Sequence, residues 1–313
     1  MLQFQEEINS IYQRALKNAP HLESWQGHFL ARKTEAEILI NKFKFNKNLI
    51  GLEIGCGNAF QSALIALFCG RVFATDIFRE AKSQHYFGIR QVKELKDILG
   101  IKNMELVSCS ALNLPFSDGY FDFVYSSSVV EHIKNREQAL SEIRRVLKPD
   151  GIMILTVPTH MPSLYAFMHS FLYIISRLNK ILTQRQKQMS TTVYSPKGIK
   201  DSAWLRFRKN HPSFPLPEPH GDYPTVFHEF FQQLPLKWSR LLRKSGFTVQ
   251  DYFCMNIIPW SLMEPISTKK AAEMYSALKN FHLKNRPKAI LSYCGYLICF
   301  ISGKYIPKKN LTN

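Results

Sequence analysis

The sequence predicts an α/β fold in which helices cover both faces of a doubly wound, largely parallel sheet. Between residues 48 and 158, short apolar segments alternate with segments of helical periodicity. The apolar segments are continuous rather than alternating, which is typical of strands buried on both faces. The chain of 313 residues is 45% hydrophobic and 21% charged, so it is long and apolar enough to bury one large core.

The elements follow one another in a regular order up to Pro158. Residues 8–16 and 34–43 keep helical spacing, so helices are expected before the first strand. The core is then expected as strand 48–54, helix 59–68, strand 71–75, helix 83–99, strands 104–109 and 121–125, helix 136–147 and strand 152–157. Gly100 is expected as a helix C-cap, and Lys148-Pro-Asp-Gly151 as the stop of the last helix.

The regular alternation stops at Pro158. Residues 160–234 are irregular, aromatic and rich in proline, and order returns with a helix at 237–244 and a strand at 247–253. The apolar run 289–301 is shorter than the ~20 residues of a membrane-spanning helix, so a final strand is expected there.

A glycine-rich turn joins the first strand to the first helix of the core. In Glu53-Ile-Gly-Cys-Gly-Asn-Ala59, the glycines let the backbone turn tightly and approach a ligand closely. Asp76 follows Gly57 by 19 residues and ends the second strand, where a carboxylate can accept hydrogen bonds from both hydroxyls of a ribose. The pair predicts a site for a nucleoside-containing cofactor, with a ligand-free turn as the alternative.

The residues around the turn favour one cofactor over another. The dinucleotide fingerprint needs a third small residue where this chain has Phe60, and Glu53 would repel a diphosphate. No phosphate-binding P-loop motif occurs either. An acidic residue suits a ligand that carries an amino group and a sulfonium, so S-adenosylmethionine is expected rather than NAD.

Four blocks of this sequence resemble, in order, the core of class I S-adenosylmethionine-dependent methyltransferases. The blocks are GLEIGCGNA, ATDIF, LNLPFSDGYFDFVYSSSVVEHI and ALSEIRRVLKPDGIMILTVP, and they cover residues 49–157. The most similar branch is the small-molecule group that includes quinone-biosynthesis enzymes. The resemblance implies a Rossmann-like mixed sheet, mostly parallel with an antiparallel last strand, and S-adenosylmethionine as cofactor.

The resemblance also implies roles for single residues. Glu53, Gly55, Cys56 and Gly57 would line the methionine part of the cofactor, and Asp76 would hold its ribose. Ile77 would pack on the adenine, Ser110 and Ala111 would meet its edge, and Ser127 would lie beside the sulfonium. Two positions depart from the family pattern: Ala59 replaces a usual glycine, and Ser110 replaces a usual acidic residue.

These features divide the chain into four parts. We expect an N-terminal helical cap at 1–47, a cofactor-binding core at 48–158, an insertion or lid over the acceptor site at 159–234, and the C-terminal part of the same α/β domain at 235–313.

Two histidines are candidates for catalysis. Methyl transfer needs a general base only when the acceptor is protonated in the ground state. His132 follows the fourth strand, with a structural capping role as its alternative. His220 lies in the proline-rich segment 217–224 of the insertion, where a solvent-facing loop is the alternative. No metal is predicted, because His211, His220 and His228 lack metal-ligand spacing.

The net charge of +17 is concentrated in two segments. Residues 163–210 and 265–313 each hold nine basic residues and one acidic residue, whereas residues 1–162 are almost neutral. The apolar run within 164–178, followed at once by basic residues, is typical of an interfacial helix on an anionic membrane, or of a lid helix. Nucleic acid is the less favoured partner, because the sequence shows no RNA-binding module and lacks the motifs of base methyltransferases.

The sequence therefore predicts methyl transfer from S-adenosylmethionine to a small-molecule or lipid- or glycan-linked, anionic acceptor, on oxygen or carbon. The alternatives are an RNA or protein methyltransferase and a cofactor-binding subunit without turnover. Six cysteines in so long a chain do not form a disulfide framework, and the N-terminal residues lack the apolar run of a signal peptide. A cytoplasmic location, with peripheral attachment to a membrane as an option, is expected.

Overall fold

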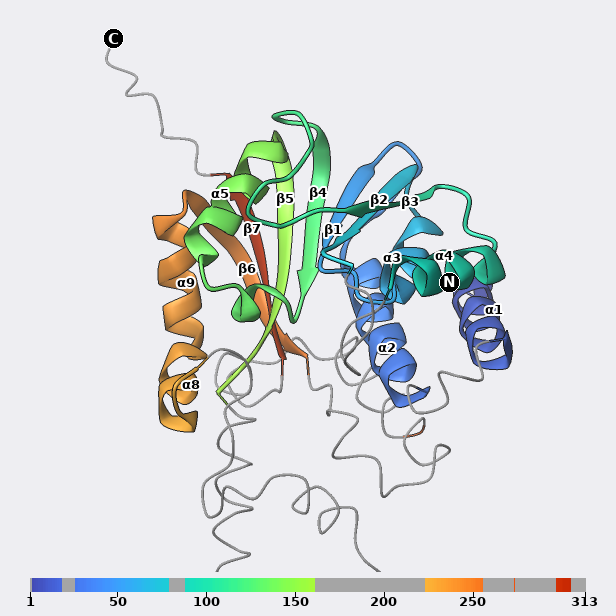
Figure 1. Cartoon of the computed structure of the whole chain (residues 1–313), viewed down its shortest axis with the longest axis horizontal. Helices are drawn as coiled ribbons and strands as arrows, with labels where there is room; N and C mark the ends of the chain where they lie inside the picture. The colour runs from blue at the N-terminus through green and yellow to red at the C-terminus, as the bar shows by residue number, and fades with distance from the viewer. Residues whose placement is uncertain are drawn as a thin grey trace, which may run out of the picture.

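A computed structural model describes residues 2–18, 26–78, 88–160, 223–255, 273 and 297–304. They form a seven-stranded sheet in the order β3-β2-β1-β4-β5-β7-β6 (Figure 1). The strands are β1 (Ile50–Ile54), β2 (Arg71–Asp76), β3 (Met104–Ser108), β4 (Phe121–Ser127), β5 (Leu147–Pro158), β6 (Phe247–Met255) and β7 (Leu297–Lys304). Strands β1 to β5 pair in parallel, and β7 runs antiparallel to both β5 and β6. The doubly wound mixed sheet and its antiparallel last strand are confirmed.

Helices lie on both faces of the sheet (Figure 1). They are α1 (Leu2–Asn18), α2 (Gln26–Lys42), α3 (Phe60–Ala66), α4 (Ile89–Leu99), α5 (Arg136–Val146), α8 (Val226–Gln232) and α9 (Pro235–Lys244), with the 3-10 helix η2 (Val130–His132). Alternate residues of β4 separate the two cores, since Tyr125 packs with the cluster of α1 to α4 and Val124 with that of α5 and α9. Both faces of the sheet are thus buried, as the continuous apolar strands predict.

The strand order reverses at β1. The chain runs outward from β1 through β2 to β3, and then returns to the other side of β1 as β4. In doubly wound sheets, ligands bind at the carboxyl ends of the strands where the order reverses. The glycine turn after β1 and the segment after β4 lie at this point, so the fold brings them together.

One expected boundary is wrong. The helix ends at Val146, close to where its stop was expected, but the strand expected at 152–157 already begins at Leu147, so Lys148-Pro-Asp-Gly151 belongs to β5. A shift in the β4–β5 register between Phe121 and Phe123 absorbs the extra residues. Gly151 is needed there, because a Cβ atom would lie 2.9 Å from Leu147 Cγ and 3.0 Å from the Asp122 carbonyl oxygen. Gly100, in contrast, caps α4 as expected, with a left-handed φ of 70°.

Several expectations lie outside the described residues, among them the whole segment 161–222 with its apolar and basic runs. In the part of the chain that the structure describes, no helix is long and apolar enough to cross a membrane.

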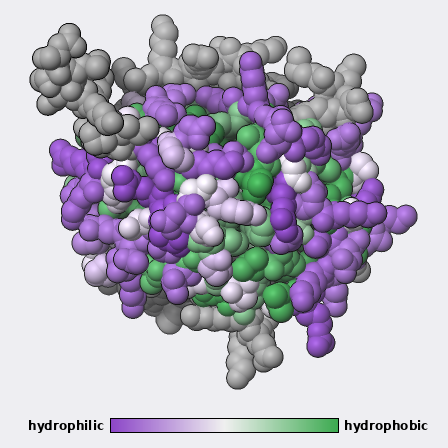
Figure 2. Space-filling model, turned by 90° about the horizontal axis from the view of Figure 1, so that it is seen from above, coloured by the Kyte–Doolittle hydropathy of each residue, from purple (hydrophilic) through white to green (hydrophobic). Residues whose placement is uncertain are grey.

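The face of the molecule seen from above carries mostly hydrophilic residues, with apolar residues between them (Figure 2).

Candidate active site

The glycine turn after β1 is held against the end of β2. The Gly55 and Cys56 amides both donate to the Thr75 carbonyl, at 2.8 and 2.9 Å. Gly55 and Gly57 have φ values of 71° and 54°, which side chains disfavour. A Cβ atom on Gly55 would also lie 2.3 Å from the Val129 side chain. The turn is therefore possible only with glycine at position 55, and it packs directly on the segment after β4.

Asp76 closes the same turn from the tip of β2. Its Oδ2 accepts a hydrogen bond from the Gly57 amide at 2.8 Å, and its Oδ1 accepts one from the Ile77 amide at 2.7 Å. A carboxylate oxygen can accept two hydrogen bonds, so Asp76 can still accept from the two hydroxyls of a ribose. Ile77 is 40% exposed beside it and offers an apolar surface. Gly57, Asp76 and Ile77 are thus brought together.

The loop after β3 reaches the same place. The Cys109 amide donates to the Asp76 carbonyl at 3.0 Å, which brings Ser110 and Ala111 close to the end of β2. The Ser110 hydroxyl accepts from the Leu112 amide at 3.2 Å, so the loop folds back on itself.

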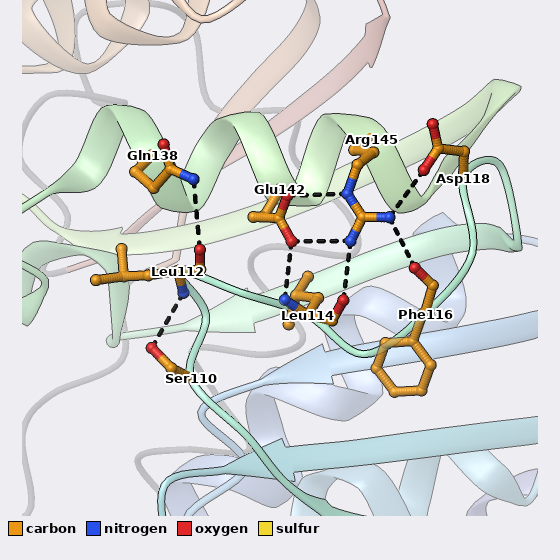
Figure 3. Close-up of polar contacts among 8 residues, drawn as sticks. All are labelled: Ser110, Leu112, Leu114, Phe116, Asp118, Gln138, Glu142 and Arg145. Carbon is orange, nitrogen blue, oxygen red and sulfur yellow. Dashed lines mark hydrogen bonds and ion pairs between the residues drawn. The ribbon is translucent and has the colours of Figure 1, made fainter.

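Arg145 of α5 holds this loop in place (Figure 3). Its guanidinium donates to the carbonyls of Leu114 and Phe116, and to the carboxylates of Asp118 and Glu142, at 2.7–2.8 Å. Glu142 in turn accepts from the Leu114 amide at 2.8 Å. The hydrogen bonds from Arg145 hold the pKa of Glu142 below its usual value.

Glu53 is buried in β1 below the turn, with 3% of its surface exposed. It accepts a hydrogen bond from the Ser62 hydroxyl of α3. Burial raises the pKa of Glu53 to about 8, although the Ser62 hydrogen bond and the nearby Arg32 charge lower it. Cys56 is buried as well, and burial raises the pKa of its thiol well above the usual value, so the thiol stays neutral.

A polar network missed by the sequence analysis joins α2 to the end of β4. Glu35 Oε1 accepts from the Tyr125 and Ser127 hydroxyls at 2.9 and 2.7 Å, and Glu35 Oε2 pairs with Arg32 Nη1 at 2.9 Å. Arg32 also donates to the Ser127 hydroxyl. Glu35 is 1% exposed, and its position inside the helical apolar stripe of residues 34–43 is the sequence signal that could have revealed it.

The two candidate catalytic histidines are differently placed. His132 ends η2, five residues beyond Ser127, and its side chain is 39% exposed with Nε2 at 3.9 Å from Glu131 Oε1. His220 lies outside the described residues. Glu131 itself is fully buried, and in the described part of the chain its carboxyl oxygens have no hydrogen-bond partner beyond its own backbone amide.

These residues fit a cationic nucleoside ligand. Glu35, Glu53 and Glu131 are buried at the carboxyl ends of β1 and β4 or beside them, with Asp76 at the tip of β2. The buried carboxyls outnumber the one guanidinium, that of Arg32, that bonds within this group. These carboxyl groups favour binding of a sulfonium and an ammonium group, and they disfavour binding of a diphosphate.

The fold and the site define a class I S-adenosylmethionine-dependent methyltransferase, and the comparisons agree. The model of the Methyltransferase domain family matches residues 52–155. The chain is a methyltransferase of this class, with S-adenosylmethionine as its cofactor.

Three similarities place the chain further. It is 25% identical to the demethylmenaquinone methyltransferase of Bacillus velezensis over 211 residues, which are 64% of this chain and 87% of that protein. It is 25% identical to sterol 4-C-methyltransferase strm-1 of Caenorhabditis elegans over 181 residues, 49% and 52% of the two chains. A methyltransferase solved with the Haloferax volcanii Trm112 methyltransferase activator shares the fold, with a TM-score of 0.50 and 11% identity over 94% of this chain and 97% of that chain.

Proposed function

We propose that this enzyme transfers the methyl group of S-adenosylmethionine to a small-molecule or lipid-linked acceptor, on oxygen or on carbon. The observation that carries the proposal is the similarity to demethylmenaquinone methyltransferase, which spans 87% of that protein. The similarity is thus much wider than residues 52–155, where the methyltransferase domain model matches. A match restricted to that domain would support only the assignment of the cofactor.

The proposed cofactor contacts follow the order of the strands. Asp76 holds the ribose, Ile77 packs on the adenine, and Ser110 and Ala111 meet its edge. Glu53, Gly55, Cys56 and Gly57 line the methionine part, and Ser127 lies beside the sulfonium. The hydrogen bonds from Gly57 to Asp76 and from Cys109 to Asp76 support a common site for these residues.

The chain's own contribution to the reaction is alignment and exclusion of water. The cofactor supplies an activated methyl group, and transfer is an in-line displacement that depends on how the acceptor atom is placed. We propose that the insertion at 159–234 covers the acceptor. His132 or His220 would take a proton when the acceptor is a hydroxyl, while an already ionised acceptor would need neither.

Radiolabelled S-adenosylmethionine incubated with a cell extract tests the proposal. We expect label in the lipid and small-molecule fractions. Label confined to RNA or protein would overturn the proposed acceptor class. With the acceptor identified, His132→Ala and His220→Ala show whether either histidine acts as the base.

A further inference from the structure

Three buried glutamates surround one arginine beside the cofactor turn. We call Glu35 of α2, Glu53 of β1 and Glu131 of η2 the acid cluster; they are 1%, 3% and 0% exposed. Arg32 is the cation among them, and its charge acts on both Glu53 and Glu131. Charged side chains at this degree of burial are rare unless they are paired or serve a ligand.

The members of the acid cluster differ in how well they are satisfied. Glu35 accepts from Arg32, Tyr125 and Ser127, so both of its oxygens are engaged. Glu53 accepts from the Ser62 hydroxyl. The carboxyl group of Glu131 has no hydrogen-bond partner among the described residues beyond its own backbone amide. An ionised carboxylate that is buried without hydrogen bonds to other residues lowers the stability of the fold. A carboxyl group that keeps its proton lowers it less.

The positive charges of Arg32 and Arg136 lower the pKa of Glu131, but they do not outweigh its burial. Arg136 of α5 turns its Nη2 to the Glu131 carbonyl at 2.6 Å and to the Tyr223 hydroxyl at 2.7 Å, rather than to the carboxyl group. His132 Nε2 lies 3.9 Å from the carboxyl, and Glu35 adds a like charge. Burial, more than any other cause, raises the pKa of Glu131 to about 8.

Glu53 also has a raised pKa, although it accepts a hydrogen bond. Burial, together with the negative charges of Glu35 and Asp76, raises its pKa to about 8. Ser62 and Arg32 act in the opposite direction but do not outweigh burial. At neutral pH the free enzyme therefore holds protons on Glu53, which directly precedes the turn of the cofactor site, and on Glu131, which lies two residues beyond the Val129 side chain at Gly55.

We propose that the acid cluster makes the enzyme sense the charge of its cofactor: Glu53 and Glu131 release protons when the cationic sulfonium form binds, and release fewer when the neutral thioether product binds. A nearby positive charge favours the ionised form of a carboxyl group. S-adenosylmethionine carries one more positive charge than S-adenosylhomocysteine. The cluster would thus favour the substrate form and assist release of the spent cofactor. This inference rests on the cofactor site proposed above and does not depend on the acceptor.

Calorimetry on the unmodified enzyme provides the first test. Binding of each form is measured at pH 7.5 in phosphate, HEPES and Tris, whose ionisation enthalpies differ. The dependence of the observed enthalpy on the buffer gives the number of protons released. We expect about one proton released with S-adenosylmethionine and clearly fewer with S-adenosylhomocysteine. Equal release for the two forms, or none for either, would overturn the inference while leaving the cofactor site intact.

A matched pair of variants locates the effect. Glu131→Gln should lower the number of protons released on binding. It should also reduce the ratio of the affinity for S-adenosylmethionine to that for S-adenosylhomocysteine by about tenfold at pH 8, with little change in the affinity for S-adenosylhomocysteine. Glu37→Gln is the control, since this glutamate is also 1% exposed on α2 but is ion-paired with Lys33 at 3.0 Å.

Further variants cover the other outcomes. If Glu131→Gln fails to fold, Glu53→Gln and the buffer series on the unmodified enzyme decide the question. Identical proton release in Glu131→Gln, Glu53→Gln and the control would contradict the assignment to the cluster. If Asp76→Asn loses all cofactor binding while the unmodified enzyme still releases protons on binding, the result supports the ribose-binding role of Asp76 and leaves the inference on the acid cluster standing.

Discussion

At the scale of single residues, Asp76 combines a structural task with the proposed binding of the cofactor. It accepts the Gly57 and Ile77 amides, which shapes the turn, and we propose that it binds the ribose. Asp76→Ala should weaken S-adenosylmethionine binding by at least about 100-fold, since each hydrogen bond to a charged group is worth ~1.5–3 kcal/mol. Calorimetry measures the affinity, and a melting curve checks the fold. Unchanged affinity in Asp76→Ala would exclude the ribose role.

Ala59 occupies a backbone conformation that favours glycine. Its φ of 58° lies in the left-handed region, at the position where the family usually has glycine. Such a conformation costs an L-residue ~1–2 kcal/mol, and the entropy of an added glycine offsets ~0.4–1 kcal/mol of that. Ala59→Gly should therefore stabilise the protein by about 0.5–1 kcal/mol in urea unfolding.

Ala63 is the control for this substitution, because it is buried inside α3 with ordinary helical geometry. Ala63→Gly should destabilise by ~1 kcal/mol or more. If both substitutions were equally destabilising, the strain assigned to Ala59 would be absent.

The site residues that could be predicted are those with a local signature. Gly55, Gly57 and Asp76 follow from a turn and a strand end, and neighbouring parallel strands bring them together. Glu35 and Arg32 could not be predicted in their roles, because they meet Ser127 across 92 and 95 positions of sequence, respectively. Nothing local in α2 indicates that its buried charges face the end of β4.

At the scale of elements, the loop between β3 and β4 depends on α5. Arg145 contacts three parts of this loop with one planar guanidinium (Figure 3). Lysine cannot reproduce this planar, several-donor geometry. Arg145→Lys should lower stability by ~1–3 kcal/mol and weaken S-adenosylmethionine binding, because Ser110 and Ala111 lie in the loop. Denaturant unfolding and calorimetry measure the two effects.

Arg71→Lys is the matched control, since Arg71 pairs with Glu105 between β2 and β3 where both side chains are nearly half exposed. Exposed pairs contribute ~0–1 kcal/mol, so this variant should change little. A loss equal to that of Arg145→Lys would show that the loop contacts have no special weight.

Most strands and helices were predictable from periodicity, and the exception is instructive. The early start of β5 at Leu147 depends on a register shift against β4. A shift of this kind depends on how two strands pair. The segment Lys148-Pro-Asp-Gly151 considered alone contains proline and glycine, which are typical of a turn. The alternation of strands and helices predicts a parallel sheet, whereas the strand order is known only from the structure.

At the scale of the whole molecule, the net charge and the buried charge have opposite signs. The chain carries +17 overall, with the excess in 163–210 and 265–313, whereas the cofactor site is rich in buried carboxyls. We propose that the basic segments serve an anionic acceptor or an anionic membrane surface, and the acid cluster serves the cationic cofactor. The sedimentation of the enzyme with anionic and neutral liposomes at low salt tests the membrane part, and absence of binding to either would contradict it.

The acid cluster should also govern how the stability of the free enzyme depends on pH. The pKa values of Glu53 and Glu131 are raised to about 8 in the folded state and lie near 4.3 when unfolded. Between these values the folded state binds more protons than the unfolded state, so the free energy of unfolding falls as pH rises. In the interval from pH 7 to 8, Glu142, whose folded pKa is lowered, no longer contributes, whereas the buried thiols begin to act in the same direction because the unfolded thiols start to ionise. Urea unfolding at pH 7 and pH 8 should show this loss of stability, and the Glu53→Gln, Glu131→Gln double variant should show a smaller loss. The double variant therefore separates the contribution of the glutamates from that of the thiols.

Saturating S-adenosylmethionine should also reduce the loss of stability between pH 7 and pH 8, because the positive charge of the bound cofactor takes the place of the missing protons. A stability that rises from pH 7 to pH 8 in the free enzyme would contradict the raised pKa values.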